Sequence, residues 1–203
     1  EEHDGPHSPW FWDVNLSGGG VLLDMGCHSI EFARWMLDRP AVKSVQATLG
    51  RFVHHDRTQG EDHSLVVVEF ENNAIGIAEN SWAKTEIYGT HGNTSADLIH
   101  GNALMTHSKT GYGYAVEKAD TTTGWTFTSF EEDWNYGFPQ EMQHFVNVVL
   151  GKEEPIETGE DGIEVLKIIY AAYQSAGEGR RIEWPYTPPQ VDKTIDLWLN
   201  VRS

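Results

Sequence analysis

Apolar residues recur at helical spacing in one stretch near the start of the chain. The positions that share one side of this stretch are Leu23, Cys27, Ile30, Ala33 and Leu37. The spacing predicts a helix over residues 17–37, with Ser17 as its N-cap because a serine hydroxyl can accept from a free amide of the first turn. The three glycines at 18–20 let another backbone, or a ligand, approach the start of this helix closely.

The middle of the chain follows the two-residue period of β-strands. Residues 42–53 and 63–70 are rich in β-branched side chains, and 74–82 returns from 63–70 across an Asn-Asn turn. Further strands are expected in 85–108, where turn residues separate three short runs, at 125–130 and, as an edge strand, at 181–184. Helical spacing reappears at 137–150 and from 158 to about 176. This order predicts an α+β fold, a mainly antiparallel open β-sheet with helices packed on one face.

The division of the chain follows from composition. Residues 1–16 are rich in Pro, His and Trp and predict an irregular N-terminal arm, since Pro6 and Pro9 disfavour a helix. Residues 17–185 form the α+β domain, and residues 186–203 form a C-terminal tail whose apolar side chains dock on another surface. A chain of 203 residues has room for one such domain and a small appendage.

Charge and cysteine content exclude several classes of protein. Lysine and arginine number 14 against 31 aspartates and glutamates, which gives a formal charge of −17. Such a chain repels nucleic acid and anionic membranes and favours neutral substrates such as polyols. The single cysteine excludes an internal disulfide framework, and no run reaches the roughly 20 apolar residues of a membrane span. A cytoplasmic location is expected, with the periplasm left open because the chain begins at Glu1 without an initiator Met.

Asp24 and His28 are the candidate catalytic pair. They are four residues apart, so a continuous helix places them one turn from each other on one face. A carboxylate beside an imidazole holds the ring in one orientation and favours its charged form, as a general base requires. The alternative is an ordinary ion pair on a solvated helix face, which has little energetic value.

Residues of three other segments are candidate substrate contacts. Flat aromatic rings stack on the apolar faces of sugars, so His7, Trp10 and Trp12 of the arm could line a sugar site; the alternative is an arm that only packs its tryptophans. Asn80 and Trp82 share one face of the strand predicted at 74–82, and Tyr136 precedes the helix predicted at 137–150. The His54-His55-Asp56 loop carries residue types that bind metals, but we interpret it as a polar loop and assign no metal site.

A dinucleotide-binding motif is missing from the sequence. Such a unit needs Gly-x-Gly-x-x-Gly between a strand and a helix. Gly111-Tyr-Gly113 lacks the third glycine, and Gly89-Thr-His-Gly92 has a different spacing. We therefore interpret the chain as the second half of a two-domain enzyme.

The segment Gly-Gly-Gly-x-Leu-x-Asp-x-Gly-x-His-x-Ile at 18–30 resembles a signature of the Gfo/Idh/MocA oxidoreductases, the glucose–fructose oxidoreductase and inositol dehydrogenase family. Similarity to the family continues to about residue 185, through Ile-Tyr-Gly-Thr-His-Gly-Asn-Thr and Pro-Ile-Glu-Thr-Gly-Glu-Asp-Gly. The resemblance implies a dihydrodipicolinate-reductase-like C-terminal domain in which Asp24 and His28 match the family's catalytic residues. It also implies NAD or NADP bound mainly by an absent Rossmann domain, a sugar, glycoside or cyclitol substrate, and a homodimer or homotetramer formed through the sheet face.

Two alternatives remain open at this stage. A family member can use a retained cofactor, with or without a metal, in a redox-assisted lyase or hydrolase reaction on glycosides, in which case the extra histidines would matter. The chain could instead be a stand-alone sugar-binding or dimerisation module. Elemental analysis separates the first alternative from a simple dehydrogenase, and the upstream coding sequence tests the second.

Overall fold

The computed structural model describes residue 6 and residues 8–52, 54–81, 85–89, 92–96, 104–108, 124–128 and 137–200. The chain divides into two compact units, the first made of residues 1–97 and 163–203 and the second of residues 98–162. The divisions predicted at residues 16 and 185 both fall inside the first unit. The N-terminal arm, the sheet and the C-terminal tail therefore belong to one unit.

A six-stranded antiparallel sheet forms the centre of the first unit, in the order β5-β4-β3-β2-β1-β8. Its strands are β1 (Val42–Gly50), β2 (His63–Phe70), β3 (Ile75–Asn80), β4 (Thr85–Gly89), β5 (Gly92–Ala96) and β8 (Ile182–Glu183). The predicted hairpin is confirmed, with Val66 opposite Ala78 and Val67 opposite Ile77. Antiparallel neighbours joined by short turns are what the alternating sequence pattern requires.

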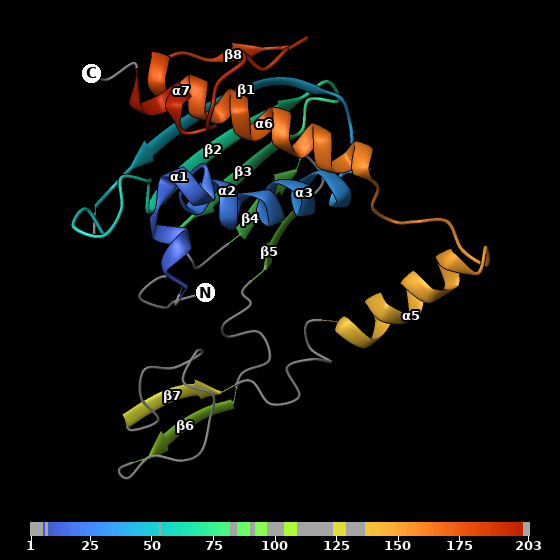
Figure 1. Cartoon of the computed structure of the whole chain (residues 1–203). Helices are drawn as coiled ribbons and strands as arrows, with labels where there is room; N and C mark the ends of the chain where they lie inside the picture. Colours follow the sequence, from blue (N-terminus) through green and yellow to red (C-terminus); the bar gives the residue numbers. More distant parts are fainter. Residues whose placement is uncertain are drawn as a thin grey trace. The chain divides into compact units, whose positions relative to one another are not determined.

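Helices cover one face of this sheet, as Figure 1 shows. They are α1 (Val14–Ser17), α2 (Val21–Asp24), α3 (Gly26–Met36) and α6 (Gly159–Glu178). The buried strand residues Val45 and Val66 pack in one cluster with Leu22, Ile30 and Ile168 from these helices. Ser175 of α6 also accepts a hydrogen bond from the Ala47 amide of β1 at 3.0 Å. The predicted α+β architecture is confirmed.

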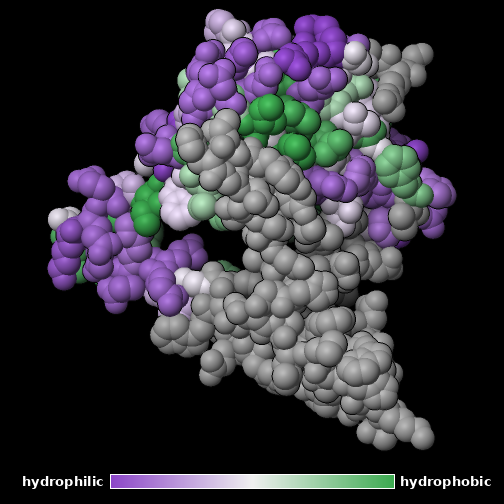
Figure 2. Space-filling view, turned by 180° about the vertical axis from the view of Figure 1, so that it is seen from behind, coloured by the Kyte–Doolittle hydropathy of each residue, from purple (hydrophilic) through white to green (hydrophobic). Residues whose placement is uncertain are grey.

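On the opposite face of the sheet, the open face, no helix packs among the described residues of the first unit. Alternate strand residues point to this side, and Leu65 and Ile75 remain 37% and 42% exposed. Figure 2, which views the molecule from behind, shows apolar residues gathered among hydrophilic ones on this side. A sheet with one packed face and one accessible face is the usual antiparallel arrangement.

The helix predicted over 17–37 is broken into three, and this prediction was wrong in detail. Gly18 has φ of +79° and ends α1, because a glycine in the left-handed region stops a helix. Ser17 is therefore the last residue of α1, and Asp13 is the N-cap that accepts from the Asn15 amide at 2.9 Å. Met25 separates α2 from α3 but keeps right-handed helical angles.

Both ends of the chain carry short helices that the sequence pattern did not reveal. The arm contains a 3₁₀ helix at Pro9–Trp12, with its proline in the first helical turn, where no amide donor is needed. The tail contains α7 (Asp196–Leu199), with Ile195 and Trp198 buried. The Ile195 amide donates to the Gly18 carbonyl at 3.1 Å, so the tail docks beside the glycine turn.

The second unit contains the antiparallel pair β6 (Leu104–Ser108) and β7 (Gly124–Thr128) and the helix α5 (Phe138–Val149). The apolar stripe predicted on α5 is present, and its side chains are exposed. Its members are Phe138, Met142, Phe145, Val146 and Val149. Nothing in the described residues shows what covers this stripe.

Candidate active site

The glycine turn before α2 fits closely around Glu61. Gly20 precedes the first residue of α2, and a Cβ at Gly20 would overlap the main-chain oxygen of Glu61 and lie 2.7 Å from its nitrogen. A Cβ at Gly19 would overlap the hydroxyl of Tyr173. The glycines therefore permit the close backbone approach that their spacing predicts.

The carboxyl group of Glu61 satisfies the first amides of α2. Its Oε1 accepts from the Gly20 amide at 3.1 Å and the Leu22 amide at 3.0 Å, while the Val21 amide donates to the Glu61 carbonyl at 3.0 Å. Tyr173 of α6 donates to the same Oε1 at 2.6 Å. Glu61 thus performs the capping that was predicted for Ser17.

Glu61 is almost completely buried, with 1% of its surface exposed. Burial raises the pKa of its carboxyl from 4.5 to about 7, and the hydrogen bonds from Tyr173, Leu22 and Gly20 offset part of that effect. Burial, together with the neighbouring carboxyl, also raises the pKa of Tyr173 well above its ordinary value. The site therefore contains a carboxyl that exchanges its proton near neutral pH.

The raised pKa of Glu61 predicts a pH-dependent stability. The folded chain holds this proton more tightly than the unfolded chain, so the stabilisation is complete below about pH 4.5 and is lost as the pH rises through about 7. The loss is expected to be about 3 kcal/mol in the free energy of unfolding. Urea denaturation of the wild type and of Glu61→Gln at both ends of this window measures it, and equal pH slopes for the two proteins would contradict the assignment.

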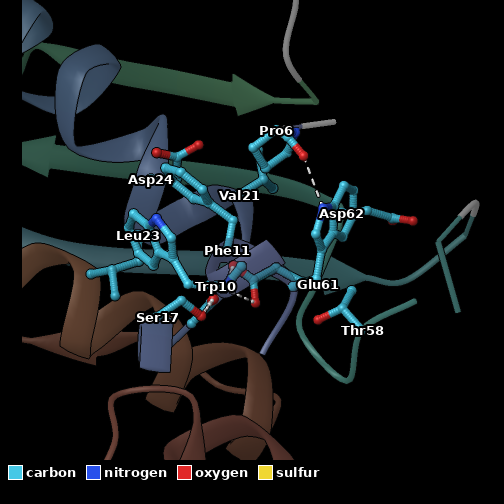
Figure 3. Close-up of a pocket in the computed structure, with 13 residues that line it drawn as sticks. Pro6, Trp10, Phe11, Ser17, Val21, Leu23, Asp24, Thr58, Glu61 and Asp62 are labelled. Atoms are coloured by element: carbon cyan, nitrogen blue, oxygen red, sulfur yellow. Dashed lines mark hydrogen bonds between the residues drawn. The ribbon is translucent and has the colours of Figure 1, made fainter. Parts of the chain in front are cut away.

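A cavity of about 210 Å³ lies over the glycine turn. Trp10, Phe11 and Trp12 supply its aromatic wall, and Asp24, Glu61 and Asp62 are its acidic lining residues. Figure 3 shows Trp10, Phe11 and the three acidic residues around the cavity. The remaining lining residues are Pro6, Ser17, Gly19, Gly20, Val21, Leu23 and Thr58. The arrangement combines flat apolar surfaces with hydrogen-bond acceptors, which suits a small polyhydroxylated molecule.

The aromatic wall is held by its own contacts. The rings of Trp10 and Phe11 stack with centroids 3.8 Å apart, and the Trp12 indole donates to the Pro6 carbonyl at 2.9 Å. The guanidinium of Arg57 lies 3.9 Å from the centre of the Trp12 ring. Such contacts fix the indole planes before any ligand arrives.

Asp24 and His28 lie on consecutive helices rather than on one. Asp24 ends α2 and lines the cavity, whereas His28 is exposed on the first turn of α3 and is not among the described lining residues. The Asp24 carbonyl accepts from the Cys27 thiol at 3.1 Å, and the His28 amide donates to Met25. Because Met25 keeps helical angles, about one helical turn still separates the two residues along the chain.

The other predicted contacts have different positions. Trp10 and Trp12 line the cavity with Asp24. Asn80 is buried, and its amide group bonds Ser29 of α3 at 2.6 Å and Ser64 of β2 at 3.0 Å, so it joins α3 to the sheet. His7, Trp82 and Tyr136 lie outside the described residues.

The loop between β1 and β2 contributes part of the cavity lining and holds it through hydrogen bonds and a ring contact. Asp62 accepts from the amides of Phe52 and His54, each at 2.8 Å, and the buried His54 ring packs edge-on against Trp12. His55 is exposed. Within the described ranges, no three His, Cys, Asp or Glu side chains gather as a metal site would require.

Sequence reasoning missed Glu61, Asp62, Thr58 and Phe11 as cavity residues and Tyr173 as a partner of Glu61. The available signal was an acidic pair placed directly before a buried strand, since a carboxylate there needs donors from another segment. The donors are 39 and 41 residues away in the chain, at Leu22 and Gly20, and their pairing is visible only in three dimensions.

Comparison with protein families decides what this site belongs to. The model described as "Oxidoreductase family, C-terminal alpha/beta domain", the Gfo/Idh/MocA type, matches residues 5–184. The chain belongs to this family. Residues 18–30, which carry the glycine turn, Asp24 and His28, lie within the matched range.

Curated relatives of the Gfo/Idh/MocA domain include sugar and cyclitol dehydrogenases. The chain is 28% identical over 187 residues to D-glucoside 3-dehydrogenase of Escherichia coli, covering 85% of this chain and 51% of that enzyme. It is 26% identical over 174 residues to myo-inositol 2-dehydrogenase of Thermotoga maritima, covering 81% and 49%. The chain therefore spans about half the length of the curated relatives it matches.

Solved structures agree with this assignment to the Gfo/Idh/MocA family. GenD2 from gentamicin A biosynthesis, crystallised with NAD, superposes with a TM-score of 0.79 at 32% identity, covering 90% of this chain and 53% of GenD2. A probable dehydrogenase from Thermotoga maritima shares the fold with a TM-score of 0.62 at 24% identity. The family match and the shared fold therefore agree.

A dinucleotide does not fit the described part of this Gfo/Idh/MocA domain. The glycine turn at 18–20 precedes a helix, but the amides of Gly20 and Leu22 at the start of that helix already donate to Glu61, and the Gly20 amide also donates to Tyr173. The neighbouring strands in the sheet pair antiparallel, whereas dinucleotide units are built on parallel strands.

Among the helices that the structure describes, none has the length and apolarity needed to cross a bilayer.

Proposed function

We propose that this chain is the substrate-binding half of an NAD(P)-dependent oxidoreductase that acts on a secondary hydroxyl or ketone of a sugar, glycoside or cyclitol. The cavity that joins Asp24 to an aromatic wall carries this proposal. Relatives named as glucoside and inositol dehydrogenases support the substrate class. Hydride chemistry would be supplied by a nicotinamide held in the other half of the parent.

His28 is the proton-transferring residue in this proposal, and Asp24 orients it. The exposed position of His28 leaves its imidazole accessible to a ligand that extends out of the cavity. Asp24 lies at the cavity wall, within reach of the same ligand. A neutral imidazole takes the hydroxyl proton during oxidation and returns it during reduction.

The cavity walls favour a neutral ring over an anionic one. The described lining residues include three carboxyl groups and no lysine or arginine. A phosphate or uronate in the cavity would meet the negative charge of the two aspartates, whereas ring hydroxyls can donate to a carboxylate such as that of Asp24. We therefore propose polyols and neutral glycosides as ligands, with myo-inositol and a methyl glucoside as probes.

Trp10→Ala is expected to weaken sugar binding by about three- to tenfold, because a stacked aromatic contributes about 0.5–1.5 kcal/mol beyond its buried area. Calorimetry or NMR titration of the chain with methyl glucoside measures the effect. Trp35→Ala is the matched control, since Trp35 is 49% exposed against 47% for Trp10 and does not line the cavity. Equal losses for both variants would rule out stacking in the cavity.

The cofactor half of the proposal has a separate test. The chain alone is expected neither to bind NAD nor to turn over a sugar. The Gly20 amide, which a phosphate would need as a donor, already donates to the Glu61 carboxyl, and Tyr173 bonds the same carboxyl. Calorimetric titration with NAD and NADP tests this expectation directly. Tight binding of either dinucleotide to the chain would contradict the proposal that the cofactor is held outside it.

We also propose that the open sheet face joins copies of the chain into a homodimer or homotetramer. Leu65 and Ile75 are exposed on that face, and Val67 and Ile77 lie between them on paired strands. An apolar strip of this kind loses solvent exposure when two copies meet. Sedimentation of the chain and of Val67→Lys tests the interface, and a wild type that stays monomeric at high concentration argues against it.

A further inference from the structure

Glu61 has no part in the proton transfer described above, yet it shares a cavity wall with Asp24. Its carboxyl is buried and bonded on three sides, by Gly20, Leu22 and Tyr173. A buried carboxyl costs free energy unless such partners compensate it, so its retention at this point calls for a reason.

A short path of hydrogen bonds leads from Glu61 to Asp24. The Gly20 amide donates to Glu61 Oε1 at 3.1 Å. The carbonyl of the same Gly20 accepts from the amides of Leu23 at 3.1 Å and Asp24 at 3.2 Å. A displacement of Gly20 is therefore transmitted through this one residue to the backbone that carries the Asp24 side chain.

We propose that Glu61 is a positioning residue for Asp24, and that the charge on its carboxyl sets the placement of the turn from Gly20 to Asp24 and hence the affinity of the cavity for its ligand. The part of this inference that concerns ligand affinity rests on the proposed function. The part that concerns the turn rests on the hydrogen bonds alone.

The chemistry of the partners gives the direction of the effect. Both amides and the Tyr173 hydroxyl converge on Oε1, so an ionised carboxyl makes charge-assisted bonds to all three. A protonated carboxyl accepts weaker bonds from the three donors, so the start of α2 is held less closely to Glu61, although burial makes this form the more stable one in the folded chain. Tyr173 from α6 is bonded to the Glu61 carboxyl, Asp24 from α2 and the adjacent Asp62 line the same cavity, and no lysine, arginine or histidine is among the described lining residues.

Amide chemical shifts of the isolated chain test the positioning role without any ligand. The shifts of Gly20, Leu22 and Asp24 are expected to titrate together, with a midpoint near pH 7. Glu61→Gln keeps the shape of the side chain, cannot ionise, and should abolish this titration. Glu79→Gln, an exposed carboxyl on the open face of the sheet, is the matched control and should leave it intact. The same titration in Glu61→Gln overturns the proposal.

Ligand binding tests the second part. Affinity for myo-inositol or methyl glucoside is expected to rise about fivefold between about pH 5.5 and 8.5, a typical coupling between two sites. Glu61→Gln should remove the rise in affinity, and His28→Gln measures any separate contribution of the imidazole to it. Tyr173→Phe should move the midpoint upward, because the carboxylate loses a donor.

The outcomes separate the two proposals. A wild-type chain that binds neither sugar at any pH, with the amide titration present, contradicts the proposed function and supports the positioning role. Sugar binding with an unchanged pH profile in Glu61→Gln supports the proposed function and overturns the positioning role. A pH profile lost only in His28→Gln assigns the dependence to the imidazole and also overturns the role of Glu61.

Discussion

Replacing Gly20 with alanine is expected to lower the free energy of unfolding by about 3 kcal/mol, the upper part of the range for an overpacked site. The new methyl group would overlap the Glu61 carbonyl oxygen and lie 2.7 Å from its nitrogen and 2.8 Å from its Cδ. Two of these three atoms belong to the backbone, so no side-chain rotation relieves the overlap. The turn must separate from Glu61 and lose the capping of α2.

Gly162→Ala is the matched control for this substitution. Gly162 lies in α6, and a Cβ there would meet nothing within 4 Å. Alanine is preferred over glycine in a helix by about 0.8–1.0 kcal/mol, so this variant should be neutral or more stable. Urea denaturation of both variants measures the difference, and a Gly20→Ala protein as stable as the wild type would show that the turn does not need a glycine.

The glycine turn also shows how far the sequence could predict this site. Three consecutive glycines correctly indicated close approach by another backbone. They did not indicate which backbone, because Glu61 is 41 residues away from Gly20. Gly18 in this triplet also interrupts the predicted helix, because it takes a left-handed conformation. The spacing of apolar residues does not reveal that conformation.

Local patterns were predicted most accurately where partners are close in the sequence. The β2–β3 hairpin was predicted, and the alternation placed Gly76, Ala78 and Asn80 on one face of its return strand, which is the face that the structure buries. The arm was predicted less well, since its prolines hid a 3₁₀ helix that presents Trp10 and Phe11 to the cavity. Asn80 was on the predicted face, but that face packs against α3.

In the full-length parent enzyme, His28→Ala is expected to lower kcat by about 10²- to 10⁴-fold while changing KM little, because a general base acts in the transition state rather than in substrate binding. Asp24→Asn keeps the size of the side chain and removes its charge. It should lower kcat less than His28→Ala, because in the proposed function Asp24 orients the imidazole and transfers no proton itself.

His144→Gln is the matched control for the catalytic pair, because the His144 ring is bound to Glu153 at 2.6 Å and to the Ile156 amide at 3.2 Å in the second unit. Its kcat should stay within a few-fold of the wild type. Steady-state kinetics with a glucoside or myo-inositol and either nicotinamide cofactor would measure all three variants. A wild-type kcat in His28→Ala would contradict the role of the imidazole as the general base. His28 would then be an exposed side chain next to the cavity with no part in the reaction.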